Sequence, residues 1–289
     1  MSLAKMRRPG LSRVDVLVVL AITAVGLGVL LPAVHALQGR DAAKQTVNNL
    51  KQICLAIHNF DGTFKKLPPA YGWIGNFKGG GIGVSIHIHL LPFVEQEKLH
   101  LMYYDKDKKV PAVVVPQFIA KLDPSLKDKE EVGIQNFPAN LRVFADAGVA
   151  TKYDKDMPAL GEIAPGASRL VRTITDGTSN TIAFSTKYAY CGDGGSRYDS
   201  RPNAKTAAFF GQNAAKKKAH ASDKEAAFQI MPSAKVCLCS PLIAQSFLPK
   251  EIHVGLADGS VRTVSSNISV ETWNRAVQPN DGKPLGDDW

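Results

Sequence analysis

The sequence lacks the local motifs that identify several enzyme classes. No Gly-Lys-Ser/Thr sequence and no dinucleotide glycine spacing occur, although glycine is frequent between Tyr71 and Gly83. A nucleophile elbow, a zinc-binding His-Glu pair and a pair of carboxylates at a defined local spacing are also missing. We therefore predict that the protein is not an enzyme. Catalysis would require groups that are distant in sequence to meet in space. A cleft that brings together His87, His89 and Asp258 would favour an enzyme.

Cysteine is scarce, with four residues in 289. Cys237-Leu-Cys239 is no zinc motif, because zinc sites usually separate paired cysteines by two to four residues and need two further ligands. We expect a disulfide between Cys191 and either Cys237 or Cys239, and a buried thiol at Cys54. The formal net charge is +9, but the sequence lacks the arginine-aromatic pattern of a nucleic-acid site, so we predict no nucleic-acid partner. We also predict no metal or other cofactor.

Charge is absent from Val16 to Val34, a run of nineteen residues. As a helix this run covers roughly 28 Å, close to the thickness of the hydrocarbon core of a bilayer. Basic residues precede it, which favours a cytoplasmic N-terminus; they are Lys5, Arg7, Arg8 and Arg13. The run predicts a single-pass helix in the cytoplasmic membrane, with most of the chain extracytoplasmic. Simple secretion, with cleavage after Val34-His35-Ala36, is the alternative.

The residues around this run resemble those of type IV pilins and pseudopilins. Gly10, Leu11, Asp15 and Pro32 stand at pilin-like spacings, although the family usually has Phe and Glu where Leu11 and Asp15 stand. The resemblance implies that a prepilin peptidase cuts after Gly10 and methylates Leu11. It also implies that Asp15 meets the N-terminal amine of a neighbouring subunit, which offsets the cost of a carboxylate in an apolar helix. Alternatively, Asp15 is a helix-start acid favoured by the helix dipole.

Helical periodicity continues beyond the apolar run. We expect a bend at Pro32 and then an amphipathic half whose apolar stripe packs on a globular domain and ends near Asp61-Gly62. That stripe contains Val47, Leu50, Ile53, Cys54, Ile57 and Phe60. The predicted fold class is α+β, a long N-terminal helix on an antiparallel β-rich, pilin-like domain. The predicted segments are a leader at 1–10, a transmembrane half at 11–35, an amphipathic half at 36–61 and the β-rich domain at 62–289.

Several blocks resemble a large bacterial family of prepilin-type proteins of unknown function. They lie at 48–60, 67–69, 90–96, 174–181 and 257–262. Their motif residues include Asp176, Gly177, Ser179, Asn180, Asp258 and Gly259. The family usually has a histidine ten residues before this second Asp-Gly, where Leu248 stands here. Some pseudopilins hold calcium in a late loop, and Asp193 with Asp199 are the nearest equivalents, without an EF-hand spacing.

Turn and strand patterns outline the domain. Alternation over 84–90 predicts a strand with His87 and His89 on one open face. Further strands are expected at 169–175 and 181–186, with Asp176, Ser179 and Asn180 bonding local backbone in the turn between them. A hairpin is expected from Ile252 to Val264 around Asp258-Gly259, followed by a helix capped by Ser269 and a loose tail to Trp289.

These features predict a structural subunit of a type IV pilus or of a type II secretion pseudopilus. The expected partners are prepilin peptidase, other pilin-like subunits and the lipid bilayer. One alternative is a membrane-anchored binding module for glycans or peptides that does not polymerise. A secreted enzyme is the weaker alternative.

Overall fold

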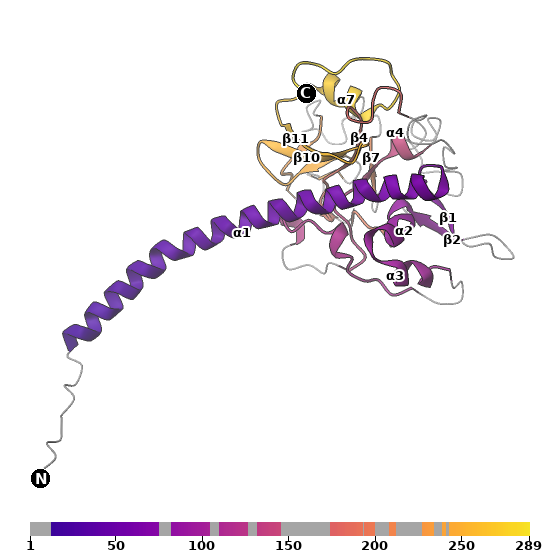
Figure 1. The fold of residues 1–289 in the computed structure, drawn as a ribbon. Helices are drawn as coiled ribbons and strands as arrows, with labels where there is room; N and C mark the ends of the chain where they lie inside the picture. Colours follow the sequence, from indigo (N-terminus) through magenta and orange to yellow (C-terminus); the bar gives the residue numbers. More distant parts are fainter. Residues whose placement is uncertain are drawn as a thin grey trace, which may run out of the picture. The chain divides into compact units, whose positions relative to one another are not determined.

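The structure is a computed structural model. It describes residues 13–74, 82–104, 110–126, 132–145, 174–192, 194–199, 208–211, 227–233, 239–240 and 243–289. The chain forms two compact units, Met1–Lys44 and Gln45–Trp289. The boundary falls inside helix α1 (Arg13–Phe64), which stays helical through Asp15 and Pro32 (Figure 1). Gly10 and Leu11 lie outside the described residues.

The predicted apolar stripe of α1 is confirmed within the second unit. Leu50, Ile53, Cys54 and Ile57 are fully buried, as their helical spacing requires. Asn49 is not part of this stripe but is buried too, and its amide nitrogen donates to the carbonyl oxygens of Pro116 and Ile119, both at 2.8 Å. The helix also continues past Asp61-Gly62 to Phe64.

The prediction of a membrane anchor is wrong for the part of the chain that the structure describes. A spanning helix needs about 20 consecutive, predominantly apolar residues. Among the described residues, no helix is long and apolar enough to cross a bilayer. The transmembrane half and the placement in the cytoplasmic membrane are therefore not supported.

A five-stranded sheet lies at the centre of the second unit, in the order β11-β10-β4-β3-β7 (Figure 1). Its strands are β3 (Ala139–Asn140), β4 (Ile182–Ser185), β7 (Phe209–Phe210), β10 (Glu251–Leu256) and β11 (Val261–Ser265). The pairs are antiparallel except β3 with β7, which is parallel. The fold is thus mixed α and β with a long N-terminal helix. The prediction of an antiparallel sheet is only partly right, because the main sheet includes the parallel pair β3 and β7.

Among the described residues there are also three two-stranded sheets. Two are antiparallel pairs and one, β8 with β9, is parallel. Their strands are β1 (Tyr71–Ile74), β2 (Ile82–Ser85), β5 (Tyr190–Cys191), β6 (Gly194–Gly195), β8 (Gln229–Ile230) and β9 (Gln245–Ser246). The strand predicted at 181–186 is confirmed as β4, whereas most of the one predicted at 169–175 lies outside the described residues.

Strand β10 is buried on both faces. One face lies against α1, because a Cβ atom at Gly255 would come within 2.2 Å of the Cys54 sulfur and 3.2 Å of Leu50. Only glycine allows the helix so close. Alternate residues of a strand face opposite sides, so the other face forms an apolar layer with α7 (Val270–Val277). We call this set the α7 layer; its main members are Ile252, Val254, Leu256, Trp273 and Val277.

The segment 84–90 is not one strand as predicted. Strand β2 ends at Ser85, and the next five residues form the short helix α2 (Ile86–Leu90). Both histidines are buried instead of lying on an open face; His87 is fully buried and His89 is 8% exposed. Other short helices in the described ranges are η1 (Leu91–Val94), α3 (Glu97–Met102), η2 (Pro116–Phe118), η3 (Pro124–Leu126) and α4 (Leu141–Phe144).

The C-terminal hairpin and the helix after it are confirmed as β10, β11 and α7. The Ser269 hydroxyl accepts from the backbone N–H of Thr272, the predicted N-cap. The tail that follows is tied down instead of loose. Its last residue, Trp289, lies under the guanidinium of Arg262, with 4.8 Å from the guanidinium carbon to the ring centroid.

Candidate functional site

The two Asp-Gly motifs meet next to the second half of α1. The backbone N–H of Asp258 donates to Thr178 O at 3.1 Å, and that of Ala257 donates to Thr181 O at 2.9 Å. Gly177 and Gly259 have φ values of +102° and +92°, which favour glycine. Blocks 80 residues apart in sequence therefore form one loop cluster, whose members are Asp176, Gly177, Ser179, Asn180, Asp258 and Gly259.

Contact with α1 explains part of this cluster. A Cβ atom at Gly259 would lie 3.3 Å from the Leu55 side chain and 3.6 Å from that of His58. Asp258 turns the hairpin, since its carboxylate accepts from the backbone N–H and the hydroxyl of Ser260. This carboxylate is thus engaged in the turn, and it takes no part in a cleft with His87 and His89, which lie in the buried helix α2.

Asp176 holds the C-terminal tail. Its carboxylate accepts from the backbone N–H groups of Asp281 at 2.6 Å and Gly282 at 3.0 Å. We expected local backbone bonds, and this is confirmed only for Asn180, whose side chain donates to the Asp176 carbonyl oxygen at 3.1 Å. Ser179 is exposed in the same turn. The loop therefore joins the hairpin turn on one side and the tail on the other.

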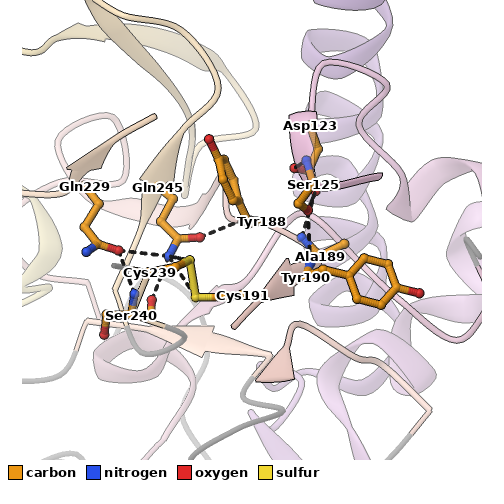
Figure 2. The surroundings of a disulfide bond; sticks show 10 residues. All are labelled: Asp123, Ser125, Tyr188, Ala189, Tyr190, Cys191, Gln229, Cys239, Ser240 and Gln245. Carbon is orange, nitrogen blue, oxygen red and sulfur yellow. Dashed lines mark hydrogen bonds between the residues drawn. A yellow bond between two sulfur atoms is a disulfide. The ribbon is translucent and has the colours of Figure 1, made fainter. Parts of the chain in front are cut away.

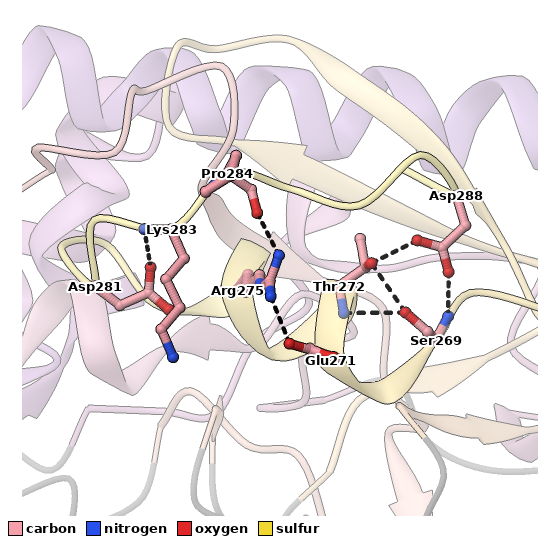
Figure 3. A network of polar contacts seen from close by, with 8 residues as sticks. All are labelled: Ser269, Glu271, Thr272, Arg275, Asp281, Lys283, Pro284 and Asp288. Carbon is pink, nitrogen blue, oxygen red and sulfur yellow. Dashed lines mark hydrogen bonds and ion pairs between the residues drawn. The ribbon is translucent and has the colours of Figure 1, made fainter.

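A second set of bonds anchors the tail to α7 (Figure 3). The Asp288 carboxylate accepts from the Thr272 hydroxyl at 2.5 Å and from the Ser269 N–H at 2.6 Å. These bonds lower the pKa of Asp288 to about 2. Arg275 donates to Pro284 O at 2.7 Å and pairs with Glu271 at 2.5 Å.

A cavity of about 340 Å³ lies between loop and tail, with Asp176, Arg275 and Lys283 in its wall. Because its wall carries both signs of charge, it indicates no single class of ligand.

The expected disulfide of Cys191 is present and its partner is Cys239, with a Cα–Cα distance of 5.4 Å (Figure 2). Cys237 lies outside the described residues. The fully buried Gln245 lies beside this disulfide, with its amide nitrogen 3.1 Å from the Cys239 sulfur. The same amide donates to Ser240 O at 2.7 Å and to the side chain of Gln229 at 3.0 Å. The bridge therefore sits in a hydrogen-bonded layer.

A polar core lies between the disulfide and the η2–η3 region. We use this name for Asp123, Ser125, Asn136, Lys187 and Gln245, all of which are buried. The Asp123 carboxylate accepts from Ala189 N at 2.7 Å and from Ser125 (Figure 2). It also accepts from the Asn136 side chain at 2.7 Å. Burial nevertheless raises its pKa above the ordinary value, because these bonds compensate only part of the lost hydration.

Two basic side chains in or beside the polar core have a lowered pKa. Burial lowers the pKa of Lys187 to about 7, and its ammonium donates to Phe209 O at 3.2 Å. Burial also lowers the pKa of His87 to about 4; its ring Nε2 lies 2.9 Å from Phe137 O. The Cys54 thiol is buried as expected, and burial raises its pKa. Both basic groups contact backbone carbonyl oxygens within the core, which is a structural role.

Of the two candidate calcium ligands, Asp199 alone lies in the described part of the chain. Asp199 pairs with Arg197, with distances of 2.9 and 2.8 Å, and Asp193 lies outside the described residues. Among the described residues, no group of three or more His, Cys, Asp and Glu side chains is placed to hold a metal ion. Leu248, at the usual histidine position, lies in the β9–β10 turn, where its backbone N–H donates to the Ser246 hydroxyl at 2.9 Å.

Sequence reasoning missed the polar core. Asn136, Gln245 and Asp123 carry no local motif. Ser125 and Ser240 are near in sequence, but other partners of these three residues lie 13 to 66 residues away. Their only sequence signal is a position among apolar residues outside the family blocks, which does not distinguish buried from exposed polar groups. The family motifs, in contrast, proved to mark real neighbours in space.

Comparison with known proteins gives one match. A family model described as a protein of unknown function (DUF1559) matches residues 38–113. This interval contains the first three blocks of the resemblance but neither Asp-Gly motif. No curated protein and no solved structure matches the chain.

Proposed function

We propose that this protein is a pilin-like structural subunit that assembles through the first half of α1. The single observation that carries the proposal is the division of that helix. Its second half supplies the core of the globular unit through Leu50, Ile53 and Ile57, while residues up to Lys44 belong to a separate unit. One helix thus joins a folded domain to an element of a different kind.

The composition of the first half supports assembly between copies. The run from Val16 to Val34 carries no charge, and Val16, Leu17 and Leu20 are 46%, 66% and 59% exposed. Exposed apolar side chains in a cluster are typical of interaction surfaces. Packing of such helices from several copies would remove this surface from water, which provides the free energy of assembly. No cofactor is required for this step.

Charge complementarity supports the predicted processing. Removal of residues 1–10 after Gly10 would create an amine at Leu11, four residues before the carboxylate of Asp15. Asp15 of one copy would then neutralise the amine of an adjoining copy and set the register between helices. Uncompensated charges in an apolar interface are costly, so this pairing makes assembly depend on prior cleavage by a prepilin peptidase.

Two measurements on the protein isolated from its native cells test the proposal. Mass spectrometry of the N-terminus should find N-methyl-leucine at Leu11. Chemical cross-linking should give a ladder of multimers that Asp15→Ala abolishes. Asp41→Ala is the matched control, because Asp41 is an exposed acid of the same helix outside the apolar run, and it should leave the ladder intact. An intact Met1, or equal ladders for both variants, would overturn the proposal.

A binding function is the second candidate. It is favoured by a separate observation, an aromatic pocket at the end of α1, and it is compatible with assembly because the pocket lies wholly within the second unit.

A further inference from the structure

The aromatic pocket has a volume of about 360 Å³ and lies where α1 ends. Its walls come from α1, β1, α2, η1 and α3, elements that are close in sequence and packed into the same unit. This volume is at the small end of the range for pockets that bind small molecules. It therefore fits a compact ligand, not an extended one.

Three phenylalanine rings form the apolar part of the wall. The Phe60 ring centroid lies 4.6 Å from that of Phe64 and 5.8 Å from that of Phe93, and Phe64 and Phe93 are 6.3 Å apart. The last two contacts are edge to face, a preferred arrangement for aromatic rings. The rings are thus positioned without a ligand, which reduces the entropy lost on binding.

Apolar surface remains open to solvent at the rim of the pocket. Phe64 is 53% exposed and Tyr104 is 43% exposed, and both residues line the pocket. Single exposed apolar residues are ordinary, but a group of them around a cavity indicates a binding surface. A ligand with an apolar ring would cover this surface.

Every ionisable wall group other than Tyr104 is basic. The wall contains Lys66, His89 and His100 but no aspartate or glutamate. Burial, together with His100 and Lys66, lowers the pKa of His89 to about 3, and burial also lowers the pKa of His100. Lys66 is the exposed lysine of this wall, and Glu97, on α3, is the acid that influences His100.

We infer that this pocket binds a small monocarboxylate with an aromatic body, the ring against Phe60, Phe64 and Phe93 and the carboxylate beside Lys66. The inference goes beyond the proposed assembly function, since none of these residues lies in the first half of α1. A carboxylate is favoured over a neutral head group by the charge of the wall, and a ring is favoured over a linear chain by the three preformed aromatic contacts.

Titration of the full chain with 3-phenylpropionate and with its neutral analogue 3-phenylpropan-1-ol, followed by calorimetry, tests this inference. The acid should bind about fivefold more tightly than the alcohol, the upper range for an exposed ion pair. Lys66→Met should remove this preference while leaving the affinity for the alcohol unchanged. Lys98→Met, an exposed lysine of α3 outside the wall, is the matched control and should retain the preference.

Phe93→Ala should weaken both ligands, because it removes ring contacts common to them, and circular dichroism should show that the variant remains folded. Saturable binding of neither ligand would overturn the inference. Equal losses in Lys66→Met and Lys98→Met would overturn it too. If affinity for the acid falls as the protein concentration rises, a second copy covers the pocket and the small-ligand assignment is wrong. All variants should keep the multimer ladder, so this test and that of the assembly function fail separately.

Discussion

The polar core and the α7 layer are equally well buried but are stabilised differently. Around Asn136 and Gln245, nearly every contact is a hydrogen bond with a defined partner. In the α7 layer, Ile252, Val254 and Trp273 make apolar contacts that have no directional requirement. A buried polar group without its partner loses its hydration and gains nothing, whereas an apolar contact can be replaced by another of similar size.

This difference predicts how each region responds to substitution. In the α7 layer, restoring volume should restore stability. In the polar core, volume should have little influence, because the cost comes from the partners that are left without hydrogen bonds.

The largest effect is expected for Asn136→Leu. Its side chain donates to Asp123 and to Lys187 O at 2.9 Å and accepts from Ala120 N at 2.9 Å. Leucine has a similar volume but leaves all three groups buried without this partner. We expect the free energy of unfolding to fall by about 5 kcal/mol. Urea unfolding measures it, with the exposed Asn267→Leu as a control that should stay within about 0.5 kcal/mol of the unmodified protein. A small loss in Asn136→Leu would show that the polar core behaves as an apolar filler.

Trp273 gives the corresponding result for the α7 layer. It is 4% exposed and packs against Phe228, with 5.0 Å between ring centroids. Trp273→Ala should cost about 4 kcal/mol through lost burial and a cavity. Trp273→Phe should recover most of this loss, since it refills the space with an apolar ring. Equal losses for the two variants in the same urea experiment would contradict the contrast with Asn136.

The same contrast explains what the sequence could predict. Helical spacing identified Leu50, Ile53 and Ile57, and the Asp258-Gly259 turn identified the hairpin, because apolar periodicity and turn chemistry are local. Asn49 is buried against its hydrogen-bond partners Pro116 and Ile119. Because these partners lie about 70 residues away in the sequence, no local pattern predicts this burial.

The α2 histidines show a different limit. The alternation of apolar residues and histidines predicted a strand with the histidines on an open face. All five residues of α2 are buried, so this interpretation is wrong. A segment of five residues is too short for the periods of helix and strand to be distinguished. The wall of the aromatic pocket was not anticipated either, because it depends on how the end of α1 packs against η1 and α3.

Lys187 should give the polar core a dependence on pH. Its pKa is about 7 in the folded state and near 10.5 when unfolded, so between pH 7 and 9 the unfolded state holds more protons. Stability should therefore rise with pH in this window, by roughly 2 kcal/mol over the two units, and the contribution should be lost as the pH falls towards 7. Lys187→Met should remove this slope in unfolding curves recorded at pH 7, 8 and 9, whereas the exposed Lys250→Met should retain it. An identical slope in Lys187→Met would mean that other groups cause it.

The smallest effect is expected at the start of α7. The Ser269 hydroxyl accepts from Thr272 N at 3.2 Å and donates to the Thr272 hydroxyl at 2.9 Å, but its position is exposed, so water can replace both bonds. Ser269→Ala should cost about 1 kcal/mol, the usual value for a lost N-cap. Ser269→Asp should retain the cap yet bring a second carboxylate close to Asp288, so it should recover less than Ser269→Asn does. Thermal unfolding at low and high salt separates these cases, because only the aspartate variant should gain stability from charge screening. If alanine and asparagine are equivalent here, the tail bonds of Asp288, not the cap, fix the start of this helix.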